Sequence, residues 1–577
     1  MEKIKVSEYL ARFLEARGVP AVFELSGGMI AVMLDSIATQ GKIPIISMRH
    51  EQGAAFAADA VGRLTGIPGV AMATSGPGAV NLLTGVGSCH FDSSPAVFIT
   101  GQVNTNEQKG DRKIRQLGFQ ETDVVGMVGP ITKAAWRVKT AEEVPEMFER
   151  AFRIATEGRP GPVLIDVPMN VQRAWIECPE RFGCVETPSS SKFPETDAVW
   201  EALLQAKRPL MLVGGGIRAG RAADEFRALI ETIPFPVVHS LMAVDVLPFD
   251  SPSRVGMIGS YGNRWANTAI HRSDLIVVLG SRLDVRQTGA KTESFKAQRR
   301  IFHIDCEAGE LNNRVAGCDT IHSGVLPFLT VFRHHMPAIP AAYLKSLGQW
   351  REEIAGLRLK WPDTDENENP KGINPNALMH QLSKVSRSAS TFVVDVGQHQ
   401  MWAAQSLELM ANQRFITSGG MGSMGFALPA SIGASVCQPG KPVVVIAGDG
   451  GFQCNIQELQ TVAHHPLPIK MVVLNNNCHG MVRQFQESYF QGRFQSTLVG
   501  YSAPSFESVA RAFGIPASAI SATESIPKAL EELWADPSSP FLLEVKIDTF
   551  ANAYPKMLFN EPIDKMEPKD SGPTGTF

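Results

Sequence analysis

The stretch KPVVVIAGDGG, residues 441–451, is an apolar run that ends in glycines around Asp449. A second apolar run, IKMVVLNNN at 469–477, ends in three asparagines, and Asn476 follows Asp449 by 27 residues. Short Val/Ile-rich runs bounded by such residues are typical of buried parallel strands. Open α/β sheets bind ligands at the carboxyl ends of their strands, so both runs are expected to deliver polar groups to one site.

These residue types favour a metal–diphosphate clamp. Glycines let the backbone approach closely and direct N–H groups at phosphate oxygens. The Asp449 carboxylate and the Asn476 carbonyl are hard oxygen donors suited to Mg²⁺, which commonly also binds phosphates. The alternative is two ordinary strand-end turns, because Gly-Asp-Gly alone is a common turn sequence. The asparagines that close the second run favour the clamp.

Similar runs alternate with amphipathic segments such as VSEYLARFLEARG (6–18) along the whole chain. They form three blocks, separated by polar stretches at 178–197 and 360–372. This alternation predicts an α/β fold with three doubly wound parallel sheets, each covered by helices on both faces. The remaining strands are expected within 19–25, 43–48, 70–75, 95–101, 161–168, 208–216, 274–282, 300–307, 390–397 and 540–548.

Length and composition exclude several classes of protein. For 577 residues, about 150 per domain gives a prior of roughly four domains, but three blocks fit the pattern better. With 54 Lys+Arg against 58 Asp+Glu, the net charge of −4 argues against a nucleic-acid binder with a broad basic surface. The 8 cysteines form no CxxC pair and suit a reducing cytoplasm. Neither a secretory signal nor a membrane span is apparent, so we expect a cytoplasmic enzyme.

The GDG…NN spacing resembles the signature of thiamine diphosphate (ThDP) enzymes. The resemblance extends along nearly the whole chain and is closest to acetohydroxyacid (acetolactate) synthases and their carboligase relatives. It implies a pyrimidine-binding domain at 1–180, a central FAD-binding domain at 190–345, a diphosphate-binding domain at 365–550 and a C-terminal tail at 551–577. The matching segments are RHEQGAAFAADAVGR (49–63), ATSGPGAVNLLTG (73–85), FQETD (119–123), GRPGPVLIDVP (158–168), DVGQHQMWAAQ (395–405), SGGMGSMGFALPA (418–430) and GMVRQ (480–484).

The resemblance assigns the metal ligands to Asp449, Asn476 and the backbone oxygen of Cys478, which makes the cysteine thiol incidental. It places Met424 as the apolar fulcrum that bends the cofactor, with Met481 and Val482 beside the reacting ring. The other implied ThDP-binding residues are Gly27, Gly28, Glu51, Ser75, Gly76, Pro77, Asn81, Gln102, Val396, Gly397, Gln398, His399, Gly422, Gly448, Gly450, Gly451, His479 and Gly480.

The resemblance makes Glu51 the main catalytic residue. The family uses such an acid to hydrogen-bond the aminopyrimidine ring of ThDP and shift it to its imino form, in which the cofactor is its own base. The residues at 53–57, GAAFA, are small or apolar, a setting that helps a buried carboxyl share a proton. From the residues alone, a helix-start glutamate beside Arg49 and His50 is the simpler interpretation.

The central block resembles the flavin-binding part of the same synthases. Three glycines, Gly214–Gly216, follow an apolar run, and GSRLDVR (280–286) and HID (303–305) match the family's flavin segments. Arginines would contact the diphosphate of FAD and acids its ribose hydroxyls. The implied FAD residues are Arg159, Gly214, Gly215, Gly216, Leu241, Met242, Gly259, Gly280, Arg282, Asp284, Arg286, Asp305 and Glu310.

The expected reaction is decarboxylation of pyruvate and addition of the resulting hydroxyethyl unit to a carbonyl acceptor. Phe119-Gln120 stands where simple decarboxylases often have paired histidines, and Phe485 stands where typical synthases have tryptophan. The smaller ring, the ELSGG segment (24–28) and the charged stretch 106–118 fit a different acceptor, such as the nucleotide-linked ketosugar of yersiniose-pathway carboligases. Thus the acceptor is a 2-keto acid or such a ketone, and the implied catalytic residues are Glu51, Phe119, Gln120, Met481 and Phe485.

Other functions stay open. A decarboxylase or a flavin-dependent pyruvate oxidase of the same superfamily shares most of these motifs. A catalytically silent relative would be expected to lose Glu51 or the metal motif, and both are present. ThDP sites in this family form between subunits, so the resemblance implies a homodimer or homotetramer, with pyruvate and a carbonyl acceptor as ligands and no nucleic-acid or membrane partner.

Overall fold

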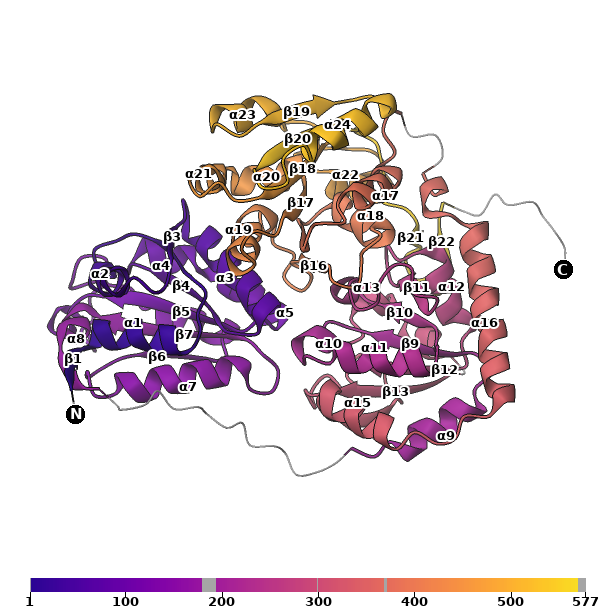
Figure 1. Ribbon diagram of the computed structural model, residues 1–577, viewed down its shortest axis with the longest axis horizontal. Coiled ribbons are helices and arrows are strands. Elements are labelled where there is room, and N and C mark those ends of the chain that lie inside the picture. The colour runs from indigo at the N-terminus through magenta and orange to yellow at the C-terminus, as the bar shows by residue number, and fades with distance from the viewer. Residues whose placement is uncertain (1, 179–193, 298, 368–370, 569–577) are drawn as a thin grey trace.

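The computed structural model describes residues 2–178, 194–297, 299–367 and 371–568. It contains three six-stranded sheets in which every strand pair is parallel, and helices flank each sheet (Figure 1). The predicted α/β fold class and its three doubly wound sheets are confirmed. Most of the polar stretch 178–197, and the end of the tail beyond residue 568, lie outside the described residues. Within the described part of the chain, no helix is long and apolar enough to cross a membrane.

The first sheet has the strand order β3-β2-β4-β5-β7-β6. Its two faces are buried by separate apolar clusters, one with α1 and α7 and one with α3 and α5. Because β2, β4, β5 and β7 are buried on both faces, they read as largely apolar runs in the sequence, which include the buried Glu24 and Asp166. The elements are β1 (Lys3–Lys5), α1 (Val6–Ala16), β2 (Val22–Leu25), α2 (Ala31–Gln40), β3 (Ile45–Ser47), α3 (Glu51–Thr65), β4 (Gly69–Ala73), α4 (Pro77–Asn81), α5 (Leu83–Asp92), β5 (Ala96–Gln102), α6 (Val124–Val128), β6 (Ala134–Arg137), α7 (Val144–Thr156), β7 (Pro162–Pro168), α8 (Met169–Arg173) and β8 (Trp175–Glu177).

The central sheet has the order β11-β10-β9-β12-β13-β14, so the chain runs outward from β9 in one direction and then from β12 in the other. This is the strand order of dinucleotide-binding folds, in which the ligand lies where the order reverses. The elements are α9 (Asp197–Gln205), β9 (Pro209–Val213), α10 (Gly216–Ala219), α11 (Ala223–Thr232), β10 (Val237–His239), β11 (Arg254–Met257), α12 (Arg264–Arg272), β12 (Leu275–Leu279), α13 (Val285–Thr288), α14 (Thr292–Lys296), β13 (Arg300–Asp305), β14 (Asp319–His322), α15 (Val325–His334) and α16 (Ala341–Lys360).

The third sheet has the order β16-β15-β17-β18-β20-β19, which is the same permutation of consecutive strands as in the first sheet. β17 and β18 are neighbours, as the ligand site requires. The elements are α17 (Pro375–Val385), β15 (Thr391–Val394), α18 (Gln398–Ser406), β16 (Arg414–Thr417), α19 (Ala427–Cys437), β17 (Val443–Gly448), α20 (Asp449–Cys454), α21 (Leu459–His464), β18 (Ile469–Asn475), α22 (Gly480–Tyr489), α23 (Phe506–Ala512), β19 (Ala517–Ile520), α24 (Ile526–Leu533) and β20 (Phe541–Lys546).

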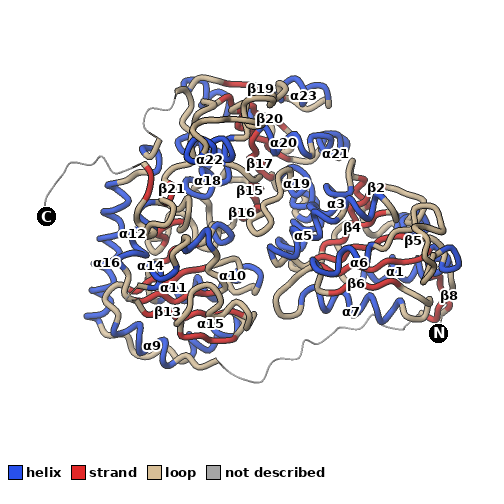
Figure 2. Tube along the Cα trace, turned by 180° about the vertical axis from the view of Figure 1, so that it is seen from behind, coloured by secondary structure: helices blue, strands red, loops and turns tan. Residues whose placement is uncertain are grey.

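Within the chain, the first and third blocks meet through α3 and α19, which lie side by side in both views (Figures 1 and 2). Phe56 packs edge-on against Phe426 at 5.3 Å between ring centroids. The buried Arg63 bonds Asp59 and Asp92 of its own block and donates to the Thr417 carbonyl oxygen at 2.7 Å. This contact fixes how the two outer blocks are oriented.

The chain returns to the central block at its C-terminal end. Two short strands, β21 (Lys556–Met557) and β22 (Met566–Glu567), pair with each other, and Met557 and Met566 join the apolar cluster under α12. Trp350 and Ile354 of α16 belong to the same cluster. By its packing, α16 is therefore part of the central block along most of its length.

Candidate active site

A cavity of about 300 Å³ lies at the carboxyl ends of β15, β17 and β18. It is the place where the sequence pattern predicts a clamp, and it brings together nearly all of the predicted residues of the third block. These are Val396, Gly397, Gln398, His399, Met424, Gly448, Asp449, Gly450, Gly451, Asn476, Cys478, His479, Gly480, Met481 and Val482.

Asp449 and Asn476 face this cavity from adjacent strand ends, since Gly448 pairs with Leu474 in the sheet. Asp449 is buried, and its Oδ2 has no hydrogen-bond partner among the described residues. Burial raises its pKa to about 6, although the Tyr501 hydroxyl and backbone N–H groups act in the opposite direction. A buried carboxylate oxygen without a partner is costly, and a bound cation would remove that cost.

Asn476 is held in place on both sides of its amide. Its Oδ1 accepts from the Cys478 backbone N–H at 3.2 Å, and its Nδ2 donates to Gln398 Oε1 at 3.3 Å. The Cys478 thiol donates to the Thr549 carbonyl oxygen at 3.4 Å, and burial raises its pKa to about 11. The thiol is therefore uncharged near neutral pH and unsuited to act as a nucleophile.

Glycines keep the cavity open. A Cβ on Gly450 would lie 2.7 Å from His479 Cε1, one on Gly480 would lie 2.6 Å from Asn476 Nδ2, and one on Gly448 would lie 2.9 Å from His399 Nδ1. Backbone N–H groups at these positions can approach a phosphate only because no side chain intervenes. The neighbouring side chains thus leave no room for a Cβ at these glycine positions.

His399 is buried beside Gly448, and its Nε2 has no partner in the part of the chain that is described. Burial lowers its pKa to about 3, so the ring is neutral. A neutral imidazole with a free ring nitrogen can donate one hydrogen bond to an anionic oxygen. Together with the unpartnered Asp449 oxygen, this makes the cavity fit a metal-bound diphosphate.

A larger cavity of about 600 Å³ separates the central block from the two outer ones. It lies where the strand order of the central sheet reverses, between β9 and β12. Its lining includes most of the predicted FAD residues: Arg159, Gly215, Gly216, Leu241, Met242, Gly280, Arg282, Asp284, Arg286 and Asp305. The predicted ThDP residue Gly422 lies here too.

Three other predicted FAD residues do not line this cavity and instead support it. The Gly214 backbone N–H donates to the Leu279 carbonyl oxygen at 3.0 Å, and Glu310 pairs with Arg159 at 3.0 Å. Gly259 has φ +107° and lies against the backbone of Arg286. Asp284 also has a structural part, since its Oδ1 caps α13 by accepting from the Arg286 N–H at 2.8 Å.

The two cavities share Val396, Gly397, Met424, Met481 and Val482. Met424 is 38% exposed at this junction. Phe485, one turn further along α22, lines only the larger cavity, is half-exposed and contacts Tyr489 at 4.7 Å between ring centroids. A ligand in one cavity would therefore lie close to a ligand in the other.

The predicted residues of the first block form a separate group. Glu51 is the first residue of α3 and is buried, and its Oε2 accepts a hydrogen bond from Asn81 Nδ2 at 2.9 Å. A Cβ on Gly78 would lie 3.0 Å from Glu51 Oε1, and one on Gly76 would lie 3.0 Å from Gln120 Cβ. Gln120 has φ +65°, and Phe119 is 80% exposed.

The remaining predicted residues of the first block surround this group. Gly27 lies against Thr74, and Gly28 has open space around it. Ser75 is buried with no partner for its Oγ among the described residues, and Pro77 opens α4. The Gln102 amide is already engaged, since its Nε2 donates to the Thr122 carbonyl oxygen at 2.9 Å and to Asp166 Oδ2 at 3.0 Å.

Glu51 and its neighbours line neither of the two cavities. Within one chain, the predicted ThDP residues are thus divided between the cavity of the third block and the group around Glu51. The packing of α3 against α19 holds the outer blocks in this arrangement. A site shared between two subunits, as the family resemblance implies, would reunite them, and that arrangement stays a prediction.

Two residues of the site were missed by the sequence analysis. The buried Asp395, next to Val396, accepts from the backbone N–H groups of Val396, Gly425 and Ala427 at 2.8–3.0 Å, and so joins the two loops that carry Val396 and Met424. Burial raises its pKa to about 6, while these N–H groups lower it. An acid that ends an apolar strand could have signalled it. Tyr501, whose hydroxyl acts to lower the pKa of Asp449, follows no pattern in its loop.

Comparisons with known proteins agree with this geometry. Models of the thiamine pyrophosphate enzyme N-terminal TPP-binding, central and C-terminal TPP-binding domains match residues 4–127, 196–330 and 395–545. The chain is 36% identical to the acetolactate synthase isozyme 2 large subunit of Escherichia coli K12, over 95% of this chain and 96% of the relative. It is 36% identical to a probable acetolactate synthase large subunit of Methanocaldococcus jannaschii (94% and 92%) and 33% identical to an acetolactate synthase of Mycobacterium bovis (98% and 92%). The chain therefore belongs to the acetolactate synthase family of thiamine pyrophosphate enzymes, and its outer blocks are ThDP-binding domains.

Proposed function

We propose that the protein decarboxylates pyruvate and joins the two-carbon unit to the carbonyl of a second 2-keto acid, giving acetolactate. One observation carries this reaction: the 36% identity to an acetolactate synthase large subunit, which extends over 95% of the chain. Incubation with ThDP, Mg²⁺ and pyruvate, followed by identification of products, tests it. Acetolactate is the expected product, and acetaldehyde alone, as from a simple decarboxylase, would contradict the proposal.

We propose Mg²⁺ as the metal, held by Asp449, Asn476 and the backbone oxygen of Cys478. The support is the buried, unpartnered Oδ2 of Asp449 beside the oriented amide of Asn476. When bound, ThDP supplies the carbon that attacks the donor's carbonyl and stabilises the negative charge left by decarboxylation. Removal of divalent ions with a chelator should abolish ThDP binding, and Asp449→Ala should do so even with excess Mg²⁺.

Glu51 is proposed to hold a proton against the pyrimidine ring of ThDP. The Asn81 amide fixes one carboxyl oxygen of Glu51, which leaves the other free to face a ligand. A buried acid oriented in this way exchanges a proton with a ring nitrogen more readily than a solvated one. Glu51→Gln should keep the fold and most ThDP affinity but lower turnover by about a hundredfold or more; near-wild-type turnover would contradict this role.

FAD is the proposed ligand of the larger cavity. The reversal of strand order, the volume of about 600 Å³ and the arginines 159, 282 and 286 in its lining support an anionic dinucleotide. Binding of FAD is tested directly. Purified protein reconstituted with FAD should retain flavin absorbance after gel filtration. Colourless protein would contradict the proposal.

We also propose a homodimer, or a tetramer of such dimers, as the active form, with 1–180, 190–345 and 365–550 as the pyrimidine-binding, FAD-binding and diphosphate-binding domains. The division of the predicted ThDP residues between two places in one chain supports a shared site. Loss of activity on dilution, in parallel with dissociation measured by light scattering, is the expected behaviour.

A ketone acceptor, such as a nucleotide-linked ketosugar, is the second candidate. Its support is Phe485, half-exposed in the lining of the larger cavity, and the exposed side chains of Arg112, Lys113 and Arg115 on the loop before Phe119, which could meet an anionic acceptor. Supplying ketones beside pyruvate distinguishes the two. Branched tertiary alcohols would favour this acceptor, and acetolactate as the dominant product would favour the plain synthase.

A further inference from the structure

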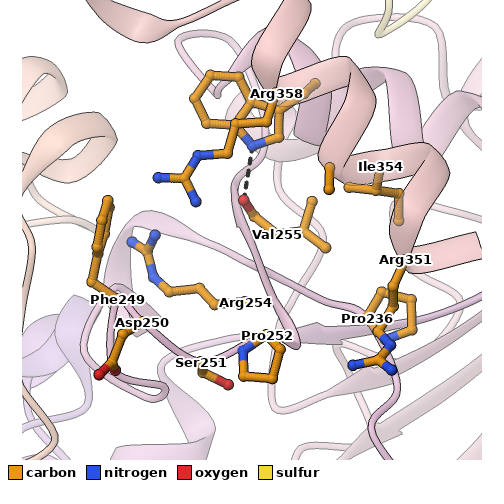
Figure 3. A pocket seen from close by; sticks show the side chains of 12 residues that line it. Pro236, Phe249, Asp250, Ser251, Pro252, Arg254, Val255, Arg351, Ile354 and Arg358 are labelled. Atoms are coloured by element: carbon orange, nitrogen blue, oxygen red, sulfur yellow. Dashed lines mark hydrogen bonds between the residues drawn. The ribbon is translucent and has the colours of Figure 1, made fainter. Parts of the chain in front are cut away.

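A third cavity, of about 380 Å³, lies at the amino ends of β10 and β11 of the central sheet and shares no lining residue with the other two cavities. Its walls come from the loop between β10 and β11, the first residues of β11, Trp265 of α12 and one face of α16. Figure 3 shows the side chains that line it. The proposed carboligase reaction uses none of them.

Three arginines line this cavity. Arg254 is only 8% exposed, and its guanidinium lies 5.3 Å from the ring centroid of Phe249. Arg358 of α16 lies 4.8 Å from the same ring and 5.6 Å from that of Trp265. In Figure 3 the guanidinium groups of Arg254 and Arg358 end beside Phe249, while Arg351 lies across the cavity near Pro236.

None of these arginines has an ion pair or a side-chain hydrogen bond to another described residue, and the buried Nε of Arg351 has no partner among them. Elsewhere on α16, Glu353 pairs with Arg208, which precedes β9, at 3.1 Å and with Arg272, the last residue of α12, at 2.8 Å. Among the described residues, arginines therefore have an ion-pair partner on one face of α16, and those on the face that lines the cavity have none.

The nearby acids do not neutralise the charge of these arginines. Asp250 is exposed at the rim. Asp363 is within electrostatic reach of Arg254, but its carboxylate is bound to His380 at 2.8 Å and to Ser406. Burial, together with the charge of Arg358, lowers the pKa of Arg254 to about 10, and Asp363 offsets this in part. Arg254 is thus still charged at neutral pH and buried without an ion pair to any described residue, which is costly unless an anion joins it.

Attraction to the aromatic ring does not remove that cost. A cation over an aromatic face gains a modest energy, but here two cations share one ring and repel each other. A single doubly charged anion between them would satisfy both. The guanidinium fork matches the oxygens of phosphate in geometry and charge.

We propose that this cavity binds a small phosphate monoester, with the phosphate held by Arg254 and Arg358. Its volume falls in the range of small-molecule sites rather than that of a single ion. The organic part would lie along Val255, Ile354 and Pro236, toward Arg351. Inorganic phosphate shares the recognised group, so the test includes it.

The experiment uses the holoenzyme saturated with ThDP, Mg²⁺ and FAD, so that its other phosphate sites are filled. Isothermal titration with ribose 5-phosphate, ribose and inorganic phosphate tests the cavity. Ribose 5-phosphate should bind and ribose should not, and added salt should weaken binding. Inorganic phosphate binding as tightly as the ester would support the phosphate site and identify the free anion as its occupant.

Variants locate the binding. Arg358→Gln should weaken ribose 5-phosphate by about tenfold or more, whereas the matched control Arg272→Gln, which removes a paired charge on the other side of α16, should not. Arg254→Met should lose binding while its melting temperature without ligand stays at or above that of the wild type, because an uncompensated charge is removed. The proposal is overturned if no probe binds at about 10 mM, if Arg358→Gln and Arg272→Gln bind alike, or if Arg254→Met melts lower and still binds.

Discussion

Two inactive variants of this protein should restore activity when they are mixed. Glu51→Gln damages the group around α3, and Asp449→Ala damages the cavity at the end of β17. In one chain these residues do not meet. The packing of α3 against α19 holds the outer blocks in an arrangement in which Glu51 does not line the cavity of Asp449. If each active site combines Glu51 of one subunit with Asp449 of the partner, a mixed dimer can carry both substitutions in one site and leave the other site intact.

The expected magnitude follows from counting sites. In a mixed dimer, one site carries both substitutions and the other carries neither. Random exchange of equal amounts makes about half of the dimers mixed, so about one quarter of all sites are intact. A tetramer of such dimers gives the same fraction. If Glu51 and Asp449 acted within one chain, every site would carry one substitution and no activity would return.

The assay is co-expression of the two variants with different affinity tags, sequential purification on both tags, and measurement of pyruvate-dependent product formation. Doubly tagged dimers should show about half of the wild-type activity per subunit. As a control, Glu51→Gln is paired with Asn81→Ala. Both residues lie in the same group, so their mixed dimers should stay inactive. Doubly tagged Glu51→Gln/Asp449→Ala protein that is as inactive as either parent would refute the shared site.

Three further predictions concern stability and cofactor affinity. Arg63→Ala should cost about 3–5 kcal/mol of unfolding free energy, because it leaves the buried carboxylates of Asp59 and Asp92 without their partner and removes the bond to Thr417. Urea unfolding measures this cost. The control Arg153→Ala, which breaks an exposed pair with Glu157, should cost less than about 1 kcal/mol. Although burial lowers the pKa of His380, its bonds to Asp363 and Glu408 outweigh that and raise it; its stabilisation is therefore full below the ordinary histidine pKa and lost as pH rises through the raised value. His380→Gln should thus cost about 2 kcal/mol at pH 6 and clearly less at pH 9, and an equal cost at both would contradict the ion pair. Gly480→Ala should weaken Mg²⁺–ThDP by about tenfold and also lower the melting temperature of the cofactor-free protein, since the new Cβ would lie 2.0 Å from Gln398 Oε1 and 2.6 Å from Asn476 Nδ2, both of buried residues. Gly356→Ala, inside α16 with open space around it, should leave cofactor affinity unchanged and should not lower the melting temperature.

Much of this fold was predictable because its strands are parallel and buried. Runs such as GPVLIDVP and KPVVVIAGDG have to be largely apolar when both faces of the sheet are covered, with a buried polar residue such as Asp166 only where it has partners, and they became β7 and β17 within a residue or two. The pairing of Asp449 with Asn476 was predictable for the same reason, since consecutive strands that end in polar residues place them along one edge. The order of apolar and polar residues along each segment is enough to predict these features.

What could not be predicted depends on contacts between distant segments. Tyr501 reaches Asp449 from a loop without periodicity, and Asp395 acts through the backbone of residues thirty positions away. The separation of Glu51 from the diphosphate cavity follows from how α3 packs on α19, which no single motif encodes. The resemblance supplied roles for residues, but only the packing shows which of them one chain brings together.

The identical strand order of the first and third sheets indicates a common origin of the two blocks. A non-consecutive order is a distinctive choice among the many that a six-stranded sheet allows, and one chain contains it twice. Duplication of an ancestral gene for a single such unit would explain this, with the central, differently ordered sheet lying between the two copies. The two blocks now differ: the third carries Asp449 and Asn476 at its strand ends, and the first carries Glu51 at the start of α3. Descent from one unit would also explain why two similar halves meet across α3 and α19.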